Sequence, residues 1–149
     1  VSIGISLTKY AIANAVSKSG NSKAFNEAIE ISKNAAIERA KTLKSLTGKK
    51  PTMTAAALDI KTSQIYFGDS GVVSENINVI LIEQMPKTSM TNWAVANCAE
   101  FNAVNNALNA GARINNLVVT TVRVKTLAME RMCANCSISL KGVLFTVSG

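Results

Sequence analysis

Apolar side chains recur at steps of three and four residues through residues 22–46, with glutamates and lysines between them. This spacing predicts an amphipathic helix that buries one of its faces. A mildly apolar stretch over residues 1–17 predicts another helix before it, and the polar residues around Gly20 separate the two. The first third of the chain is therefore expected to be helical.

The pattern changes after Gly48 and Pro51, which together stop a helix and form the clearest linker in the chain. Residues 53–60 and 64–68 are short apolar runs on either side of a polar segment at residues 61–63. Two such runs around a short polar turn predict a β-hairpin.

Residues 69–93 have no clear period. Within them residues 77–82 suit a strand and a buried helical turn equally, so both interpretations are open. A helical period returns over residues 98–110, with Asn97 as its expected N-cap and Gly111 at its C-terminal stop.

Residues 117–124 (LVVTTVRV) are continuous and rich in β-branched side chains, which predicts a strand buried on both faces. Residues 133–140 predict a short helix, and residues 143–147 a final strand. The order of elements is thus helices, a hairpin, and then helix-strand-helix-strand. This order predicts an α/β fold, in which helices pack on a sheet.

The length of 149 residues suits one compact domain. We divide it into a basic N-terminal helical segment, residues 1–50, and a core, residues 51–149. No apolar run approaches the roughly 18 residues that a membrane span needs, so we expect no membrane insertion. Lys9 interrupts the mildly apolar start, and we do not interpret that start as a signal peptide.

Positive charge is concentrated in the first segment. Residues 1–50 contain nine Lys and Arg against three Glu, whereas residues 51–149 contain seven basic and six acidic side chains. A basic segment beside a near-neutral one is what a phosphate-backbone partner would favour. A solvated helix face that keeps the protein in solution explains the same lysines, so both interpretations are open.

The candidate chemistry lies in the only three cysteines, Cys98, Cys133 and Cys136, and in one carboxylate, Glu100. Three thiolates can hold Zn²⁺ at about 2.3 Å and leave the fourth tetrahedral position open. A water at an open position reaches a pKa of about 7, and Glu100 is placed to carry its proton. If Cys98 and Cys133 each begin a helix, the two helix N-termini favour the thiolate forms.

Zn²⁺ with three thiolates has a formal charge of −1, so a nearby cation would help to keep a bound water acidic. Arg131 is the nearest in sequence, with Arg123 or Lys125 as alternatives; Arg131 as an ordinary surface residue is equally open. The cysteines also fit a redox C-x-x-C pair, or a closed structural zinc with a carboxylate as fourth ligand. The redox pair leaves Cys98 without a role. Without histidine, Ser-His-Asp and H-E-x-x-H catalysis are excluded.

These motifs resemble the cytidine deaminase-like superfamily, and within it the YwqJ-like deaminases, which are toxin domains of bacterial polymorphic toxins. The resemblance covers about two-thirds of the chain, roughly residues 52–149. It is carried by residues 56–59 and 65–68, Trp93 to Asn105 (WAVANCAEFNAVN), Gly111-Ala112, residues 117–124, and Cys133-Ala134-Asn135-Cys136. Met132 departs from the family, in which most members have proline before the C-x-x-C.

The resemblance implies a three-layer α-β-α fold with a mixed sheet, Zn²⁺ bound by Cys98, Cys133 and Cys136, and Glu100 as the proton shuttle. Expected substrate contacts are Trp93, Asn97 and Arg131. Trp93 is the best-placed aromatic for stacking a base, and an ordinary buried tryptophan that braces the helix start is the alternative.

The implied function is the hydrolytic conversion of cytosine to uracil in nucleic acid, with DNA favoured. The protein would be secreted or delivered as part of a larger bacterial toxin, would act in the cytoplasm of a target cell, and would be neutralised by an immunity protein. The last strand, residues 143–147, is expected to be an exposed sheet edge that an immunity protein or a second copy could cover.

Two alternatives keep the same cysteines. One is a deaminase of free cytidine or nucleotides, although the Asn-x-Glu ribose motif of those enzymes is not matched at Asn76 or Asn78. The other is a non-catalytic binding module that zinc stabilises. Cytosine is the preferred substrate base, because tRNA adenosine deaminases typically have His-Ala-Glu at the first ligand, whereas this chain has Cys98-Ala99-Glu100.

Overall fold

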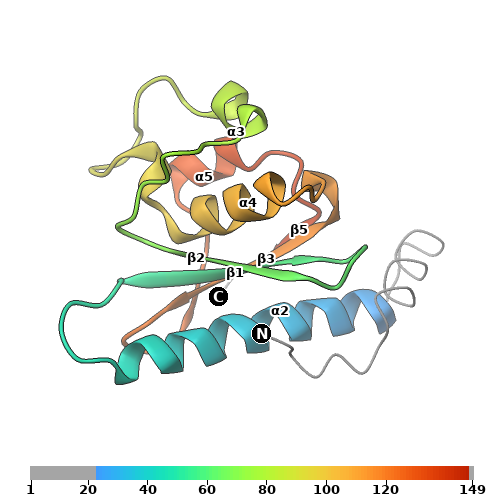
Figure 1. Ribbon diagram of the computed structural model, residues 1–149, viewed down its shortest axis with the longest axis vertical. Coiled ribbons are helices and arrows are strands. Elements are labelled where there is room, and N and C mark those ends of the chain that lie inside the picture. The colour runs from blue at the N-terminus through green and yellow to red at the C-terminus, as the bar shows by residue number, and fades with distance from the viewer. Residues whose placement is uncertain (1–22, 148–149) are drawn as a thin grey trace.

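A computed structural model describes residues 23–147, and the helix expected over residues 1–17 lies outside this range. The described chain is a mixed α/β structure (Figure 1). Its helices and strands are α2 (Lys23–Ser45), β1 (Met53–Asp59), β2 (Ile65–Asp69), α3 (Val79–Gln84), α4 (Ala99–Asn109), β3 (Leu117–Arg123), β4 (Met129–Glu130), α5 (Ala134–Ser139) and β5 (Phe145–Val147). Two 3-10 turns, η1 (Val95–Asn97) and η2 (Ile114–Asn116), precede α4 and β3.

The five strands form one mixed sheet. β1 pairs antiparallel with β2 on one side and with β3 on the other, which confirms the predicted hairpin. The far side of β3 pairs antiparallel with β4 near one end and parallel with β5 near the other. Among the described residues β5 pairs with β3 alone, so it forms a sheet edge, and its Phe145 is exposed.

Helices cover both faces of this sheet, as Figure 1 shows with α2 on one side and α3, α4 and α5 on the other. The alternation of side chains along β1 explains this arrangement. Ala55 and Ala57 pack in the core cluster that includes α4, whereas Ala56 and Leu58 pack against residues of α2. β3 is buried along six of its seven residues, which confirms the strand predicted to be covered on both faces.

The helix predicted over residues 22–46 is α2, and it packs directly on the sheet. The Arg39 guanidinium makes two bonds to the Asp69 carboxylate, at 2.7 and 3.2 Å, and lies over the Phe67 ring. The buried Ser32 hydroxyl lies 2.8 Å from the hydroxyl of Thr120 on β3. The basic first segment is therefore joined to the core through a buried polar pair and a bidentate ion pair.

The opposite face is formed mainly by α4, which lies unusually close to β2. A Cβ added to Gly68 would collide with the main chain of Ala99 and of Ala103, so only glycine permits this approach. Buried asparagines of α4 bind the loop after β2. The Asn102 side chain donates to the Val72 carbonyl at 2.6 Å, and the side-chain carbonyl of Asn105 accepts from the main-chain amide of Asn78 at 2.7 Å.

Two local predictions are corrected. The expected N-cap of α4 is wrong: Cys98 itself is the N-cap, and Asn97 ends the preceding 3-10 turn. Of the two interpretations left open for residues 77–82, the helix is right, because α3 begins there with Asn78 as its N-cap. The Asn78 side chain accepts from the Ile80 amide at 3.0 Å, a local bond that periodicity does not reveal.

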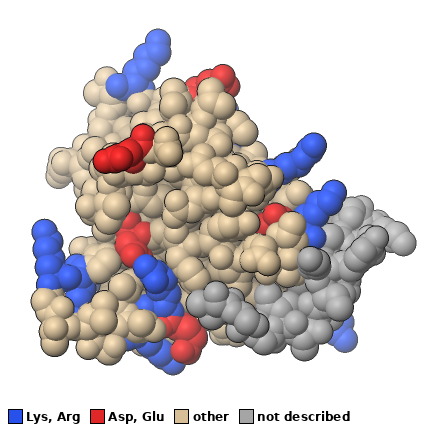
Figure 2. All heavy atoms as spheres, viewed as in Figure 1, with Lys and Arg blue, Asp and Glu red and all other residues tan. Residues whose placement is uncertain are grey.

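Charged side chains on the face drawn in Figure 2 gather at the lower left, where Figure 1 places the end of α2 and the connection to β1. None of the helices within residues 23–147 has the length and apolar character that crossing a bilayer requires.

Candidate metal centre and adjoining pocket

Four side chains that the sequence singles out meet at one point. The thiol sulfurs of Cys98, Cys133 and Cys136 and a carboxylate oxygen of Glu100 all lie within 4.8 Å of one another. The sulfurs of Cys98 and Cys133 are 3.3 Å apart, and the Cys136 thiol lies 3.3 Å from Glu100 Oε1. The structure therefore brings together the whole predicted ligand set, although 35 residues separate the first cysteine from the second.

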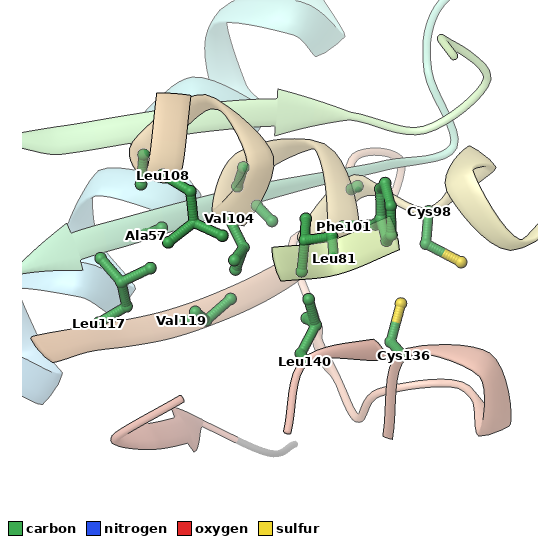
Figure 3. Packing of buried hydrophobic residues seen from close by; sticks show 14 of the residues in the cluster. Ala57, Leu81, Cys98, Phe101, Val104, Leu108, Leu117, Val119, Cys136 and Leu140 are labelled. Carbon is green, nitrogen blue, oxygen red and sulfur yellow. The ribbon is translucent and has the colours of Figure 1, made fainter. Parts of the chain in front are cut away.

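Two helix starts create this meeting point. Cys98 is the N-cap of α4 and Cys133 is the N-cap of α5, so the condition stated from the sequence, that each of these cysteines begins a helix, is met. Glu100 stands in the first turn of α4, and Cys136 lies within the first turn of α5. Figure 3 shows the Cys98 and Cys136 sulfurs directed into the same gap between these helices.

The helix start of α5 favours a thiolate at Cys133. The pKa of Cys133 is lowered well below its ordinary value, first because its sulfur lies against the Cys136 and Cys98 thiols and then because main-chain amides of α5 donate to it. The negative charge on Cys133 is stabilised when its two neighbours keep their protons, and this contact raises the pKa of both Cys98 and Cys136. Burial raises the pKa of both further, so Cys98 and Cys136 hold protons that a cation would displace.

Glu100 is only 5% exposed, and burial raises the pKa of its carboxyl above the ordinary value. Two bonds act in the opposite direction. The Thr121 hydroxyl donates to Oε2 at 2.9 Å and the Cys136 thiol donates to Oε1. A buried carboxyl with a raised pKa and a fixed orientation is typical of groups that exchange protons during a reaction.

The donor set fits Zn²⁺. All three cysteines are free thiols, and soft thiolates select zinc among the common divalent ions of cells. No ion pair within residues 23–147 involves Glu100, so no Lys or Arg neutralises this group of acidic side chains. A divalent cation would supply the missing charge.

A hollow of about 340 Å³ opens directly onto the cluster. Cys98, Glu100 and Cys133 line it, while Cys136 is fully buried behind them. The three expected substrate contacts line it as well: Trp93, Asn97 and Arg131. The remaining lining residues are Thr52, Met53, Ser70, Ala99, Thr121, Arg123 and Glu130.

Trp93 is 44% exposed, so the alternative of an ordinary buried tryptophan is wrong. Its indole Nε1 donates to the Cys98 sulfur at 3.1 Å, which places the ring at the mouth of the hollow and beside the cluster. Hydrogen bonds to a metal-binding sulfur orient the ligand and tune the metal.

Three residues at the site are not predicted by the sequence pattern. Thr121 belongs to an apolar strand, yet a threonine at the centre of a strand buried on both faces needs a polar partner, and that is a usable signal. Asn135 stands in the sequence as a spacer between Cys133 and Cys136. Glu130 on β4 accepts from Arg123 on the neighbouring β3 at 2.8 Å, and nothing in the local sequence indicates this pair.

A comparison of the chain with protein-family models, with curated proteins and with solved structures found no match. The arrangement itself offers three thiols that could hold a metal, a buried carboxyl and a hollow large enough for a small ring, all at one place.

Proposed function

We propose that this chain is a zinc-dependent nucleobase deaminase that hydrolyses cytosine to uracil in nucleic acid, with DNA favoured, and that it is a toxin domain. One observation carries the proposal: three thiols and a buried carboxyl converge within 4.8 Å at the floor of a hollow. Both the ligands and the proton carrier of the zinc deaminases are present in that set.

Cys98, Cys133 and Cys136 would hold the metal. Zn²⁺ bound there would act as a Lewis acid that makes water a competent nucleophile near neutral pH. Glu100 takes one proton from the attacking water and delivers it to the ring nitrogen of cytosine. A second proton goes by way of Glu100 to the exocyclic amine, which leaves as ammonia while the ring carbon keeps the oxygen.

The other residues of the hollow position the base. The Trp93 ring offers an exposed aromatic surface for stacking, and Asn97 and Arg131 offer polar atoms at the rim. The Thr121 hydroxyl holds Glu100 Oε2 and leaves Oε1 toward the cysteines. A volume of about 340 Å³ lies in the range of small-molecule sites, and one pyrimidine fits within it.

The toxin assignment rests on the resemblance of the Trp-x-x-x-Asn-Cys-Ala-Glu segment to polymorphic-toxin deaminases. It implies delivery as part of a larger bacterial toxin, action in the cytoplasm of the target cell, and a cognate immunity protein. The β5 edge is the surface that such a partner, or a second copy of the chain, could extend.

One observation favours a second candidate, a non-catalytic module that zinc stabilises. Glu100 lies as close to the thiols as a fourth ligand would need to lie. Its carboxylate could close the tetrahedron and leave no position for water. The hollow argues against this arrangement, because a closed structural site has no need of access.

The test compares the zinc-loaded protein with its Glu100→Gln variant. Ammonia release and product sequencing would be measured on single-stranded DNA, duplex DNA, RNA, free cytidine and an adenine-containing strand. Cytosine conversion in a polymer that the variant loses, while it keeps one zinc per chain, would support the proposal. Turnover of free cytidine alone would move the protein to nucleotide metabolism. A variant that also loses its zinc, with no turnover in the parent protein, would make Glu100 a ligand of a structural site.

A further inference from the structure

A second hollow of about 520 Å³ adjoins the first at the end of the sheet where β1 begins and β3 ends. Thr52 and Arg123 line both hollows, so the two lie side by side. The main chain fixes this junction, since the Val124 amide donates to the Thr52 carbonyl at 3.0 Å. The second hollow is therefore a part of the surface that continues outward from the cysteines.

Its lining is strongly basic. Lys44, Lys50 and Lys125 contribute to it beside Arg123, and none of its lining residues carries a carboxylate. The three lysines come from the end of α2, from the linker, and from the residues after β3, so the fold and not a local run of sequence gathers them. Figure 2 shows basic side chains at that end of the molecule.

These lysines are not used by ion pairs. The ion pairs within residues 23–147 involve Lys33, Lys41, Arg39 and Arg123, and none involves the three lysines of the second hollow. Lys50 donates to the Lys44 carbonyl at 2.5 Å, which uses one of its three hydrogens. Arg123 binds Glu130 through Nε, so this pair uses neither of its two terminal nitrogens.

We propose that the second hollow binds the phosphodiester backbone of a nucleic acid strand whose base occupies the first hollow. This inference rests on the proposed function, because it names the substrate as a chain and not a free nucleoside. A cluster of cations without carboxylates attracts phosphates, and a free nucleoside has none. Because Thr52 and Arg123 line both hollows, the second hollow lies where the phosphates next to a base bound in the first would lie.

The test uses strands that are not substrates, so that its outcome is independent of turnover. Fluorescein-labelled oligothymidylate and oligouridylate would be titrated with the zinc-loaded full chain, and anisotropy would be followed over a range of salt concentrations. The variant is Lys44→Gln, Lys50→Gln and Lys125→Gln together. The matched control is Lys61→Gln, Lys87→Gln and Lys141→Gln, which removes the same charge from exposed lysines outside both hollows.

We expect the variant to bind about tenfold or more weakly than the control at moderate salt. The slope of log affinity against log salt should fall by about 2, since each single-strand phosphate contact contributes about 0.7. The affinities for oligothymidylate and oligouridylate show whether the hollow prefers the backbone of DNA or that of RNA. Equal binding by the variant and the control would overturn this inference. The proposed deaminase function would still be tested separately, by the cytosine-conversion assay.

Two further outcomes would overturn it. Displacement of the strand by cytidine monophosphate at an affinity equal to that of the strand would make the hollow a site for one phosphate of a free nucleotide. If the unsubstituted protein binds neither oligonucleotide, the hollow is not a nucleic acid site, and an acidic protein partner becomes the explanation for its lysines. Circular dichroism of both triple variants controls for folding, and all six lysines are exposed.

Discussion

Asn135 holds the main chain at Met90: its side-chain carbonyl accepts from the Met90 amide at 2.8 Å. Its side-chain amide also donates to the hydroxyls of Ser89 and Thr91, each at 3.0 Å. One fully buried side chain between two cysteines therefore fixes the loop that leads to Trp93.

Replacing Asn135 with alanine should release that loop. We expect the Asn135→Ala protein to keep one zinc per chain, because its cysteines are intact, and to show a Michaelis constant raised about tenfold or more with a smaller change in kcat. Trp93 fluorescence should become more accessible to acrylamide. The control is Asn109→Ala, which removes an asparagine of α4 that binds Asn76 and Asn78 away from the site. Unchanged quenching in Asn135→Ala would contradict this role.

Each cysteine of the cluster should be needed for metal. Replacing Cys98, Cys133 or Cys136 with serine should lower the zinc affinity about 10-fold to 100-fold, because a hydroxyl binds zinc much more weakly than a thiolate does. Zinc content after dialysis, measured by mass spectrometry, checks this. Ser137→Ala is the control, since Ser137 is exposed and its hydroxyl donates to the Ala134 carbonyl. A serine variant that keeps full zinc would exclude that cysteine as a ligand.

Metal removal should lower the thermal stability. A ligand that binds the folded state alone, at a free concentration about 1,000 times its Kd, stabilises by about 4 kcal/mol. For a chain of this length that corresponds to a rise in Tm of roughly 10 °C. Calorimetry of the zinc-loaded protein before and after treatment with a chelator measures it, with added zinc restoring the original Tm. A Tm that does not depend on zinc would contradict a metal site in the folded protein.

Thr121 should set the pH at which Glu100 becomes active. Its hydroxyl donates to the carboxylate and favours the ionised form, so Thr121→Val raises the pKa of Glu100 further. The acidic limb of the pH–rate profile should then move to higher pH, with zinc retained and kcat reduced. The control is Thr120→Val, whose hydroxyl contacts Ser32 on the other face of the sheet. Thr120→Val should lower the stability without changing the pH of the acidic limb. The same acidic limb in Thr121→Val and Thr120→Val would contradict the role of Thr121.

Gly68 should be intolerant of a side chain. Gly68→Ala forces α4 away from β2, and a steric change of this kind costs about 1–3 kcal/mol. Gly111→Ala is the comparison: its φ of +100° is strained for alanine, but no atom lies within 4 Å of the added Cβ. Chemical denaturation should show a loss in both, while only Gly68→Ala should also weaken zinc binding, because α4 carries Cys98. Equal zinc affinity in the two variants would argue against this link.

Periodicity is enough to predict the long elements. The helix over residues 22–46, the hairpin and the buried strand over residues 117–124 appear with boundaries shifted by one residue or a few, because each has a period that its burial dictates. The three cysteines and Glu100 stand out because their chemistry is rare and their spacing short. The resemblance to deaminases stays a prediction.

What the sequence could not provide comes from contacts between distant segments. The strand β4 has only two residues, which is too short for a recognisable period in the sequence. It forms because its residues pair with Thr121 and Val122 of β3. The Asn97 cap failed because Cys98 adopts the extended conformation that a cap needs, and its side chain faces the cluster instead of the helix amides. The basic hollow joins three lysines that no window of sequence contains together.

The 3.3 Å between the Cys98 and Cys133 sulfurs also has a consequence for oxidation. Two free thiols at contact distance, one of them with a strongly lowered pKa, are well placed to react with a peroxide or a disulfide exchange reagent. Bound metal protects them, because its ligands are no longer available as nucleophiles. If these cysteines bind zinc as proposed, the chain would have to take up its metal before it meets an oxidant, because a disulfide between Cys98 and Cys133 would remove two of the proposed ligands.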